Sequence, residues 1–178
     1  MSNEGGGRIA AQATALSDGT VGSRRRGARY WVSAWWPVAV AIAVIACEST
    51  EYFGADHTSA VLRPIWQFFF GPVSDARWDA IHHLIRKTGH FVGYGMVGLT
   101  WLRAWWMTLR HWRFQSEAAL ALMATAAVAS CDEWHQTLLP NRTGTPWDVL
   151  LDCCGAVVTM LLVYIFVRIF RPTKLAHE

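Results

Sequence analysis

Hydrophobic residues gather in four long segments along the chain, separated by shorter polar stretches. A membrane-spanning helix needs about 20 mostly apolar residues, and each segment approaches that length only by including polar residues at one end. The pattern predicts an all-α, polytopic membrane protein built as a four-transmembrane-helix bundle. The segments cover approximately residues 30–47, 89–107, 117–139 and 146–170.

A shorter apolar stretch lies between the first two segments. It contains "VLRPIWQFFFG", residues 61–71, which is too short to span a bilayer. We expect it to form an interfacial or re-entrant helical segment. Gly71 and Pro72 should end it, and Ser74 is the expected N-cap of a following helix over residues 75–87. That helix could continue into the second long segment.

The two ends of the chain are polar. Residues 1–29 are rich in Gly, Ser, Ala and Arg and show no apolar periodicity, which is typical of a mobile tail. Residues 171–178 form a second, shorter tail. The remaining part, residues 30–170, is the predicted transmembrane domain.

The composition agrees with a membrane location. Hydrophobic residues make up 53% of the chain, and charged residues make up 16%, below the roughly 25% of soluble domains. The net charge is only +3, so its distribution is more informative than its size. Arg24, Arg25, Arg26 and Arg29 directly precede the first segment, where they would act as a topology signal. No basic face with interleaved aromatic residues follows, so a nucleic-acid partner is not expected.

Basic residues are unequally distributed between the two sides of the predicted bundle. If the N-terminus is cytoplasmic, and Arg8 in the distant N-terminal tail is left aside, ten lie on the inner side and five on the outer side, which favours both termini inside. The inner residues are Arg24, Arg25, Arg26, Arg29, Arg103, Arg110, Arg113, Arg168, Arg171 and Lys174. The outer residues are Arg63, Arg77, Arg86, Lys87 and Arg142.

The four cysteines lie in or beside apolar segments and form no CxxC motif. They are read as small packing residues. A disulfide from Cys131 to Cys153 or Cys154 is an alternative if that end faces an oxidising compartment. A second alternative concerns "VIAC" at residues 44–47, which resembles a lipoprotein cleavage box. Cleavage there would remove the first segment and attach a lipid to Cys47.

Polar residues recur at the outer ends of the last three predicted helices, at helical spacing within each one. Each set shares one helix face. Ionisable groups within membrane segments are costly and usually face the bundle interior, so we expect the sets to form one outward-facing polar pocket. The sets are Lys87, His90 and Tyr94; Asp132, His135 and Gln136; and Asp148 and Asp152.

Other residues should shape this pocket. Glu133 lies roughly a quarter-turn from the face of Asp132, and Arg142 lies in the following turn, where it could pair with a carboxylate or an incoming phosphate. Thr145 is the expected N-cap of the last helix, with Pro146 at its first position. Gly89 with Gly93, and separately Gly155, should allow close helix approach.

Three motifs resemble those of the VanZ-like family of small bacterial membrane proteins. They are "RKTGHFVGYG" from residue 86, "DEWHQ" from residue 132 and "PNRTGTPWDVLLDCCG" from residue 140. The resemblance covers approximately residues 30–170 and implies a multi-pass protein of the bacterial cytoplasmic membrane. The founding member of the family is linked to reduced susceptibility to teicoplanin, so the resemblance also implies a link to glycopeptide resistance.

The favoured hypothesis is a membrane protein that binds an anionic or polar cell-envelope ligand, such as a lipid headgroup or a lipid-linked cell-wall precursor. Lys87, His90 and Arg142 would contact the anion. The carboxylates that would orient these residues are Asp132, Glu133, Asp148 and Asp152. Neither a cofactor nor a bound metal is expected, and the sequence leaves the oligomeric state open.

Two other hypotheses stay open. In a membrane enzyme, Glu133 or His135 would serve as general base, and a divalent metal could be ligated by His90, His135, Asp132 and Asp148. Alternatively, the polar residues form a buried network that only holds the helices together. In that case Glu133→Gln would destabilise the protein, whereas the functional hypotheses predict a folded, inactive variant.

Overall fold

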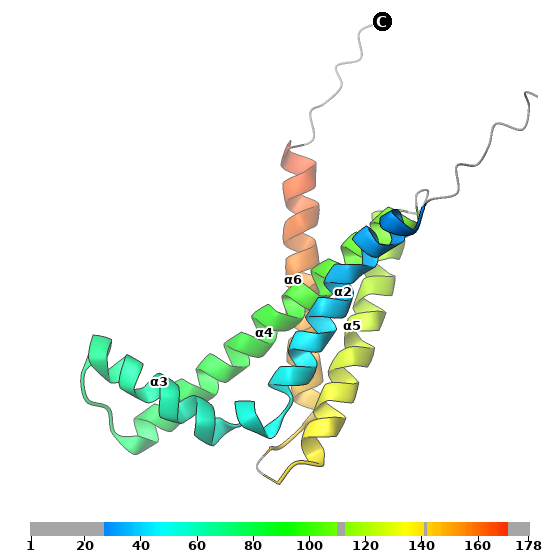
Figure 1. Ribbon diagram of the computed structural model, residues 1–178. Coiled ribbons are helices and arrows are strands. Elements are labelled where there is room, and N and C mark those ends of the chain that lie inside the picture. The colour runs from blue at the N-terminus through cyan, green and yellow to red at the C-terminus, as the bar shows by residue number, and fades with distance from the viewer. Residues whose placement is uncertain (1–26, 110–112, 141, 171–178) are drawn as a thin grey trace, which may run out of the picture. The chain divides into compact units, whose positions relative to one another are not determined.

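The computed structural model describes residues 27–109, 113–140 and 142–170, which are helical and contain no strand. The chain divides into two compact units, residues 1–32 and 33–178. Only residues 27–32 of the first unit are described. In chain order the elements are α2 (Ala28–Glu48), η1 (Glu51–Phe53), α3 (Ala55–Phe70), α4 (Asp75–Thr108), α5 (Phe114–Thr137) and α6 (Pro146–Phe170) (Figure 1).

Several predictions fall on residues that the structure does not describe. The mobile tail expected over residues 1–29 lies almost entirely outside the described residues, and the tail over residues 171–178 lies wholly outside them. The same is true of six of the basic residues used for orientation, namely Arg24, Arg25, Arg26, Arg110, Arg171 and Lys174.

Three described helices, α2, α5 and α6, are long and apolar enough to cross a membrane. The remaining expected span, residues 89–107, is the second in chain order and forms the second half of α4. It is absent from this set, since its apolar residues are interrupted by glycines, aromatic residues and Arg103. The helix expected over residues 75–87 and the second apolar segment are one continuous helix of 34 residues.

Helices α4, α5 and α6 pack against one another, and small residues allow α4 and α6 to approach closely. A Cβ atom built on Gly155 would lie 2.1 Å from the backbone oxygen of Phe91, so the expected close approach at Gly155 is confirmed. One on Gly98 would lie 2.8 Å from the Cβ of Ala156. These positions tolerate no side chain without movement of a neighbouring helix.

The close approach expected at Gly89 and Gly93 is wrong. No described atom lies within 4 Å of a Cβ placed on Gly89, and the nearest atom to one on Gly93 is a side-chain carbon at an ordinary 3.9 Å. The close contact instead uses Gly95 and Gly98, farther along the same helix. Small residues recur along α4, and the rotation of the helix decides which of them face a neighbour.

Helix α2 contacts the other helices through large side chains. The ring of Trp35 meets Trp101 and Trp105 edge-on, with centroids 5.8 and 5.0 Å apart. Farther along, Ile45 packs with Tyr94 in a buried apolar cluster. Bulky contacts hold helices farther apart than glycine contacts do, which leaves space between α2 and α4.

Helix α3 lies alongside the first turns of α4 (Figure 1). Three polar contacts join them: Trp78 Nε1 to Ser59 Oγ at 2.6 Å, Thr58 Oγ1 to His82 Nε2 at 3.0 Å, and Arg63 to Asp75 at 2.6 Å. The aromatic residues at the end of α3 remain exposed, with Phe68 at 82%. Exposed aromatic residues of this kind are typical of an amphipathic helix whose apolar face lies against the membrane interface.

The turn between α3 and α4 follows the predicted pattern. Helix α3 ends at Phe70, and Gly71 adopts a positive φ of 83°, a conformation that favours glycine. Helix α4 begins at Asp75, directly after the expected cap residue Ser74, although the Ser74 side chain makes no capping hydrogen bond.

Helix α6 is apolar outside and partly polar inside. Its buried residues are Asp152, Gly155, Ala156 and Met160. Its exposed large hydrophobic residues include Leu161, Leu162, Phe166 and Ile169. Large hydrophobic side chains facing outward and small or polar ones facing inward are typical of a helix surrounded by lipid.

Candidate functional site

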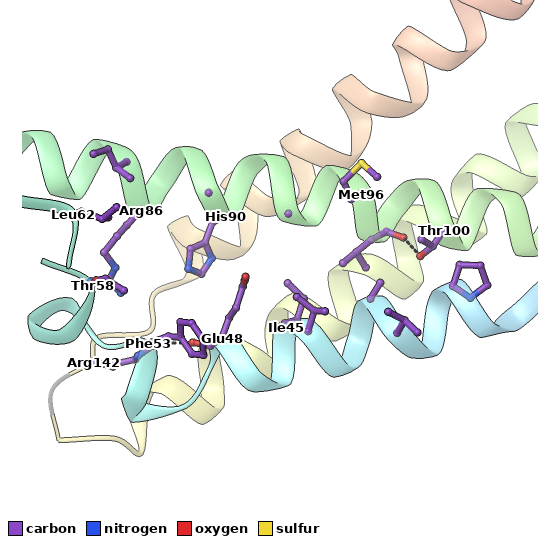
Figure 2. A pocket seen from close by; sticks show the side chains of 18 of the residues that line it. Ile45, Glu48, Phe53, Thr58, Leu62, Arg86, His90, Met96, Thr100 and Arg142 are labelled. Carbon is purple, nitrogen blue, oxygen red and sulfur yellow. Dashed lines mark hydrogen bonds between the residues drawn. The ribbon is translucent and has the colours of Figure 1, made fainter. Parts of the chain in front are cut away.

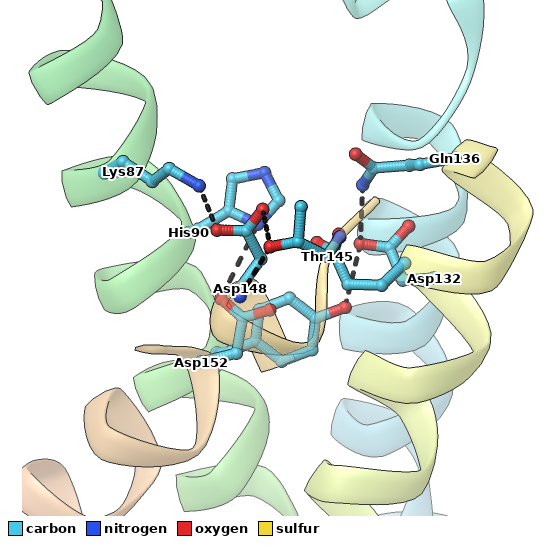
Figure 3. Close-up of polar contacts among 9 residues, drawn as sticks. Lys87, His90, Asp132, Gln136, Thr145, Asp148 and Asp152 are labelled. Carbon is cyan, nitrogen blue, oxygen red and sulfur yellow. Dashed lines mark hydrogen bonds and ion pairs between the residues drawn. The ribbon is translucent and has the colours of Figure 1, made fainter. Parts of the chain in front are cut away.

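The start of α6 places the first carboxylate of the site. As expected, Thr145 precedes Pro146 as the N-cap, and its Oγ1 accepts a hydrogen bond from the Asp148 backbone N–H at 3.3 Å. Thr145 Oγ1 also donates to Asp148 Oδ2 at 3.1 Å. The capped turn directs Asp148 toward α4, where it forms an ion pair with Lys87 (Figure 3).

A second, fully buried group links α4 and α5. The hydroxyl of Tyr94 donates a hydrogen bond to Asp132 Oδ2 at 3.0 Å, and Gln136 Nε2 donates to the same oxygen at 3.1 Å. All three residues are buried. A carboxylate that accepts two internal hydrogen bonds is held in one orientation, so this part of the site is rigid.

The third group joins all three packed helices. His90 of α4, Glu133 of α5 and Asp152 of α6 each place one nitrogen or oxygen atom within 4.8 Å of the others. His90 Nδ1 lies 3.5 Å from Asp152 Oδ1. Glu133 Oε2 accepts a hydrogen bond from the backbone N–H of Thr145 at 3.0 Å. The expected polar sets on the three helices therefore meet, as Figure 3 shows for His90 and Asp152.

His135 does not join this cluster. It is exposed, and its Nδ1 pairs with Ser49 Oγ at 2.8 Å, near the end of α2. The set of His90, His135, Asp132 and Asp148 considered as metal ligands is therefore not the one that the fold brings together. Glu133, which the sequence placed to one side of the polar face, takes the inward position instead.

The burial pattern of α5 accounts for the inward position of Glu133. Buried residues on α5 recur every fourth position at Glu117, Ala121, Thr125 and Ala129. Continuing that stripe by one turn gives Glu133. Residues four apart share a helix face, so Glu133 continues the buried stripe of α5, although small residues on every face of this segment keep the stripe from being recognised in the sequence alone.

A small polar cavity of about 130 Å³ opens beside these groups. Its lining comes from α4, α5, the following turn and the start of α6. The residues are His83, Arg86, Lys87, His90, Glu133, Gln136, Arg142, Thr143 and Asp148. Six of the ten residues expected in the pocket border it, and the four outside this lining are Tyr94, Asp132, His135 and Asp152.

A larger groove of about 580 Å³ runs between α2 and α4. Most of its lining is apolar and includes Val40, Val44, Ile45, Met96 and Val97. Figure 2 shows the change along its length: Met96 and Thr100 lie toward one end, and Arg86, His90 and Arg142 toward the other. These last three residues also line the polar cavity, so the two spaces share a boundary.

Arg142 holds the turn against the end of α2. Its Nη2 donates to the backbone oxygens of Glu48 at 2.7 Å and Thr50 at 2.9 Å. Its Nε has no hydrogen-bond partner among the described residues. Burial lowers the pKa of the Arg142 guanidinium below its ordinary value, because a charged group is less stable away from water.

Arg86 was not among the residues expected in the pocket. It is partly buried, lines both spaces and has no hydrogen-bond or ion-pair partner among the described residues. The sequence signal is its position four residues before His90, which puts both on one face of α4.

All four cysteines are described and free of disulfides, so the alternative bridge from Cys131 to Cys153 or Cys154 is not formed in this structure.

Comparisons with known proteins agree with this architecture at the level of family. No curated protein and no solved structure matches the chain. The sequence profile of the VanZ/LLP1 family matches residues 30–168, and the chain, with its three helices of membrane-spanning length, belongs to that family.

Proposed function

We propose that this protein binds a cell-envelope lipid with an anionic headgroup at the outer face of the bacterial cytoplasmic membrane. The observation that carries the proposal is the shared boundary of the apolar groove and the polar cavity at Arg86, His90 and Arg142. An amphipathic ligand needs an apolar and a polar space that meet, because its two parts are covalently joined.

The apolar groove suits a hydrocarbon chain. It lies between α2 and α4, and its lining of Val, Ile, Met and Ala side chains offers no charge until Glu48, Arg86 and Arg142. In a membrane this surface would contact lipid tails in any case, so a bound chain would enter it without crossing water.

The polar end suits a phosphate. Arg86 has no described partner, and Arg142 uses one nitrogen for two backbone oxygens and leaves its Nε unpaired. A guanidinium presents several N–H donors that match phosphate oxygens. Lys87 is already paired with Asp148, which leaves the two arginines as the principal contacts for an anion.

This proposal includes a membrane topology with four spans, in which residues 89–107 of α4 form the second. Both termini would then be cytoplasmic, as the distribution of Lys and Arg favours. The turn around Arg142 and the start of α4 would face outward, with α3 at the interface. A reporter fusion at each terminus tests this arrangement, and an external reporter at either end would contradict it.

The family relation extends the proposal to physiology. The founding VanZ-like protein is linked to reduced susceptibility to teicoplanin, a glycopeptide that acts on the outer side of the membrane. A protein that binds lipid-linked cell-wall precursors on that side could change access to the drug target. We therefore expect expression of this chain to lower teicoplanin susceptibility and Arg142→Ala to remove the effect.

Direct binding provides the decisive test. Purified protein in nanodiscs is titrated with a fluorescent polyprenyl phosphate and, in parallel, with the matching uncharged polyprenol. Saturable binding of the phosphate alone is expected, at least tenfold weaker in Arg86→Ala and Arg142→Ala. Arg77→Ala changes an exposed arginine on α4, the helix that carries Arg86, and serves as the matched control. Equal binding of the uncharged lipid, or unchanged binding by both arginine variants, would overturn the proposal.

A membrane enzyme is the second candidate, and Glu133 favours it. The Glu133 carboxylate borders the same cavity as Arg86 and Arg142, where it could accept a proton from water or substrate. His135, the other candidate base, lies against Ser49 instead. Release of phosphate from a polyprenyl diphosphate, abolished in a folded Glu133→Gln variant, would favour catalysis over binding.

A further inference from the structure

We propose that His90, Glu133 and Asp152 bind a divalent transition-metal ion. One ligand atom from each residue lies within 4.8 Å of the other two, a separation that a central ion can bridge with small rotations of the side chains. The three residues come from α4, α5 and α6. The inference goes beyond the proposed lipid binding and does not depend on it.

The environment of the Asp152 carboxylate is the strongest indication of a cation site among these three residues. Its side chain is 0% exposed, and neither carboxylate oxygen accepts a hydrogen bond from any described residue. The closest donor is His90 Nδ1, at 3.5 Å from Oδ1, which is longer than an ordinary hydrogen bond. A buried carboxylate whose one described contact is this long ion pair to His90 is unfavourable, and a cation beside it would remove that cost.

The neighbouring carboxylate of Asp132 provides a comparison within the same structure. Asp132 is also buried, but its Oδ2 accepts hydrogen bonds from Tyr94 and Gln136. The fold therefore supplies two hydrogen-bond donors to Oδ2 of Asp132, whose Oδ1 accepts none, whereas neither oxygen of Asp152 accepts a hydrogen bond from the described residues. Asp152 is the one that faces His90 and Glu133.

The ligand types indicate the class of metal. One imidazole nitrogen and two carboxylate oxygens form a mixed set that suits Mn²⁺, Fe²⁺, Co²⁺ and Zn²⁺, whereas Ca²⁺ and Mg²⁺ prefer oxygen ligands alone. Two carboxylates also balance the charge of a divalent ion. Three protein ligands leave at least one coordination position free.

Supporting contacts hold two of the ligands. The Glu133 carboxylate accepts a hydrogen bond from the Thr145 backbone N–H, and the His90 ring stacks on Tyr94 with centroids 6.2 Å apart. Such outer contacts orient metal ligands. His90 and Glu133 line the polar cavity, which provides a route for the ion and directs the free coordination position toward the cavity.

The test measures metal content, so its result is separable from lipid binding. Untagged protein is treated with a chelator, titrated with Zn²⁺ and with Mn²⁺ by calorimetry, and analysed for bound metal after gel filtration. We expect one equivalent of at least one of these ions per chain. Binding should raise the thermal unfolding temperature, and Co²⁺ should give visible absorption bands.

Matched variants connect the metal with this cluster. Asp152→Asn and Glu133→Gln keep the side-chain shape and should lose stoichiometric binding together with the thermal shift. Glu117→Gln changes another buried glutamate on α5, and His57→Gln changes an exposed histidine on α3. Both controls should bind as the wild type does. If Asp152→Asn does not fold, Glu133→Gln provides the same comparison.

The outcomes separate clearly. Loss of binding in the cluster variants with retention in both controls supports the site. Absence of stoichiometric Zn²⁺ and Mn²⁺ binding by the wild type overturns the proposal, as does undiminished binding by the folded cluster variant. In that case the three residues would belong to a buried polar network that only holds the helices together.

Discussion

The hydroxyl of Tyr94 on α4 donates a hydrogen bond to Asp132 on α5, 3.0 Å away and shielded from solvent. The sequence predicts both residues in the outward-facing polar pocket. In the structure neither lines the polar cavity between Lys87 and Arg142. Their contact connects α4 and α5 beside that cavity, where both residues line a smaller space with His90, Gln136 and Arg142, so it helps to position the site.

Replacing Tyr94 by Phe should therefore reduce stability more than it reduces ligand binding. Asp132 would lose one of its two internal donors, and an unsatisfied buried acceptor costs about 1–3 kcal/mol. Chemical denaturation of the purified protein measures the change. Tyr52→Phe, at an exposed tyrosine, is the control and should stay within about 0.5 kcal/mol of the wild type. Equal stability of the two variants would contradict a structural role for the Tyr94 hydroxyl.

The ion pair of Lys87 and Asp148 should show measurable coupling. Their side chains are 33% and 14% exposed, so water screens the pair only partly. In a double-mutant cycle with Lys87→Met and Asp148→Asn, the doubly substituted protein should be more stable than the two single effects predict, by about 1 kcal/mol or more.

The pair of Arg63 and Asp75 supplies the comparison for this cycle. The Asp75 side chain is 87% exposed, and exposed pairs couple by roughly 0.2–1 kcal/mol. A coupling at Lys87 and Asp148 no larger than this would show that α4 and α6 gain little from their ion pair.

Gly155→Ala should be severely destabilising, whereas Gly89→Ala should not. A methyl group on Gly155 would meet the Phe91 backbone oxygen at 2.1 Å, and backbone cannot rotate away. Overpacking of this kind costs about 1–3 kcal/mol or more. Gly89 has no described atom within 4 Å of the same position, and alanine in an exposed helix interior is favoured over glycine by about 0.5–1 kcal/mol. Thermal unfolding in detergent compares the two variants.

The packing of α3 on α4 should weaken in mild acid. Burial, followed by the charge of Arg86, lowers the pKa of His82 below its ordinary value of 6.5. The unfolded chain then binds a proton at a higher pH than the folded chain does. The contribution of neutral His82 to the free energy of unfolding is fully present above about pH 6.5. It is lost as the pH falls toward the lower pKa that His82 has in the folded chain.

His82→Gln provides the test, since glutamine can pair with Thr58 but does not titrate. The unfolding temperature of the wild type should fall more steeply than that of the variant between pH 7 and pH 5. Parallel curves for the two proteins would exclude His82 as the titrating group.

Local patterns in the sequence were sufficient for the helices and several of their ends. Long apolar segments separated by polar stretches predicted each long helix. A chain that crosses a membrane must form its backbone hydrogen bonds internally, as a helix does, and present apolar side chains to lipid. Gly71 ends α3, and Thr145 with Pro146 begins α6, as the chemistry of these residues predicts. The gathering of Lys87, His90, Asp148 and Asp152 also followed from helical spacing and from the cost of charge in a membrane.

Tertiary packing decided which flank of each helix faces the others. Polar residues surround the end of α5, so their spacing alone left its rotation undetermined, and His135 was expected on the inward face but lies exposed against Ser49. The rotation of α4 and α6 toward each other is likewise decided by close contacts of small residues, such as Gly98 on α4 and Gly155 on α6. Those contacts depend on pairs of residues more than 50 positions apart, and no local pattern in the sequence specifies how such pairs meet.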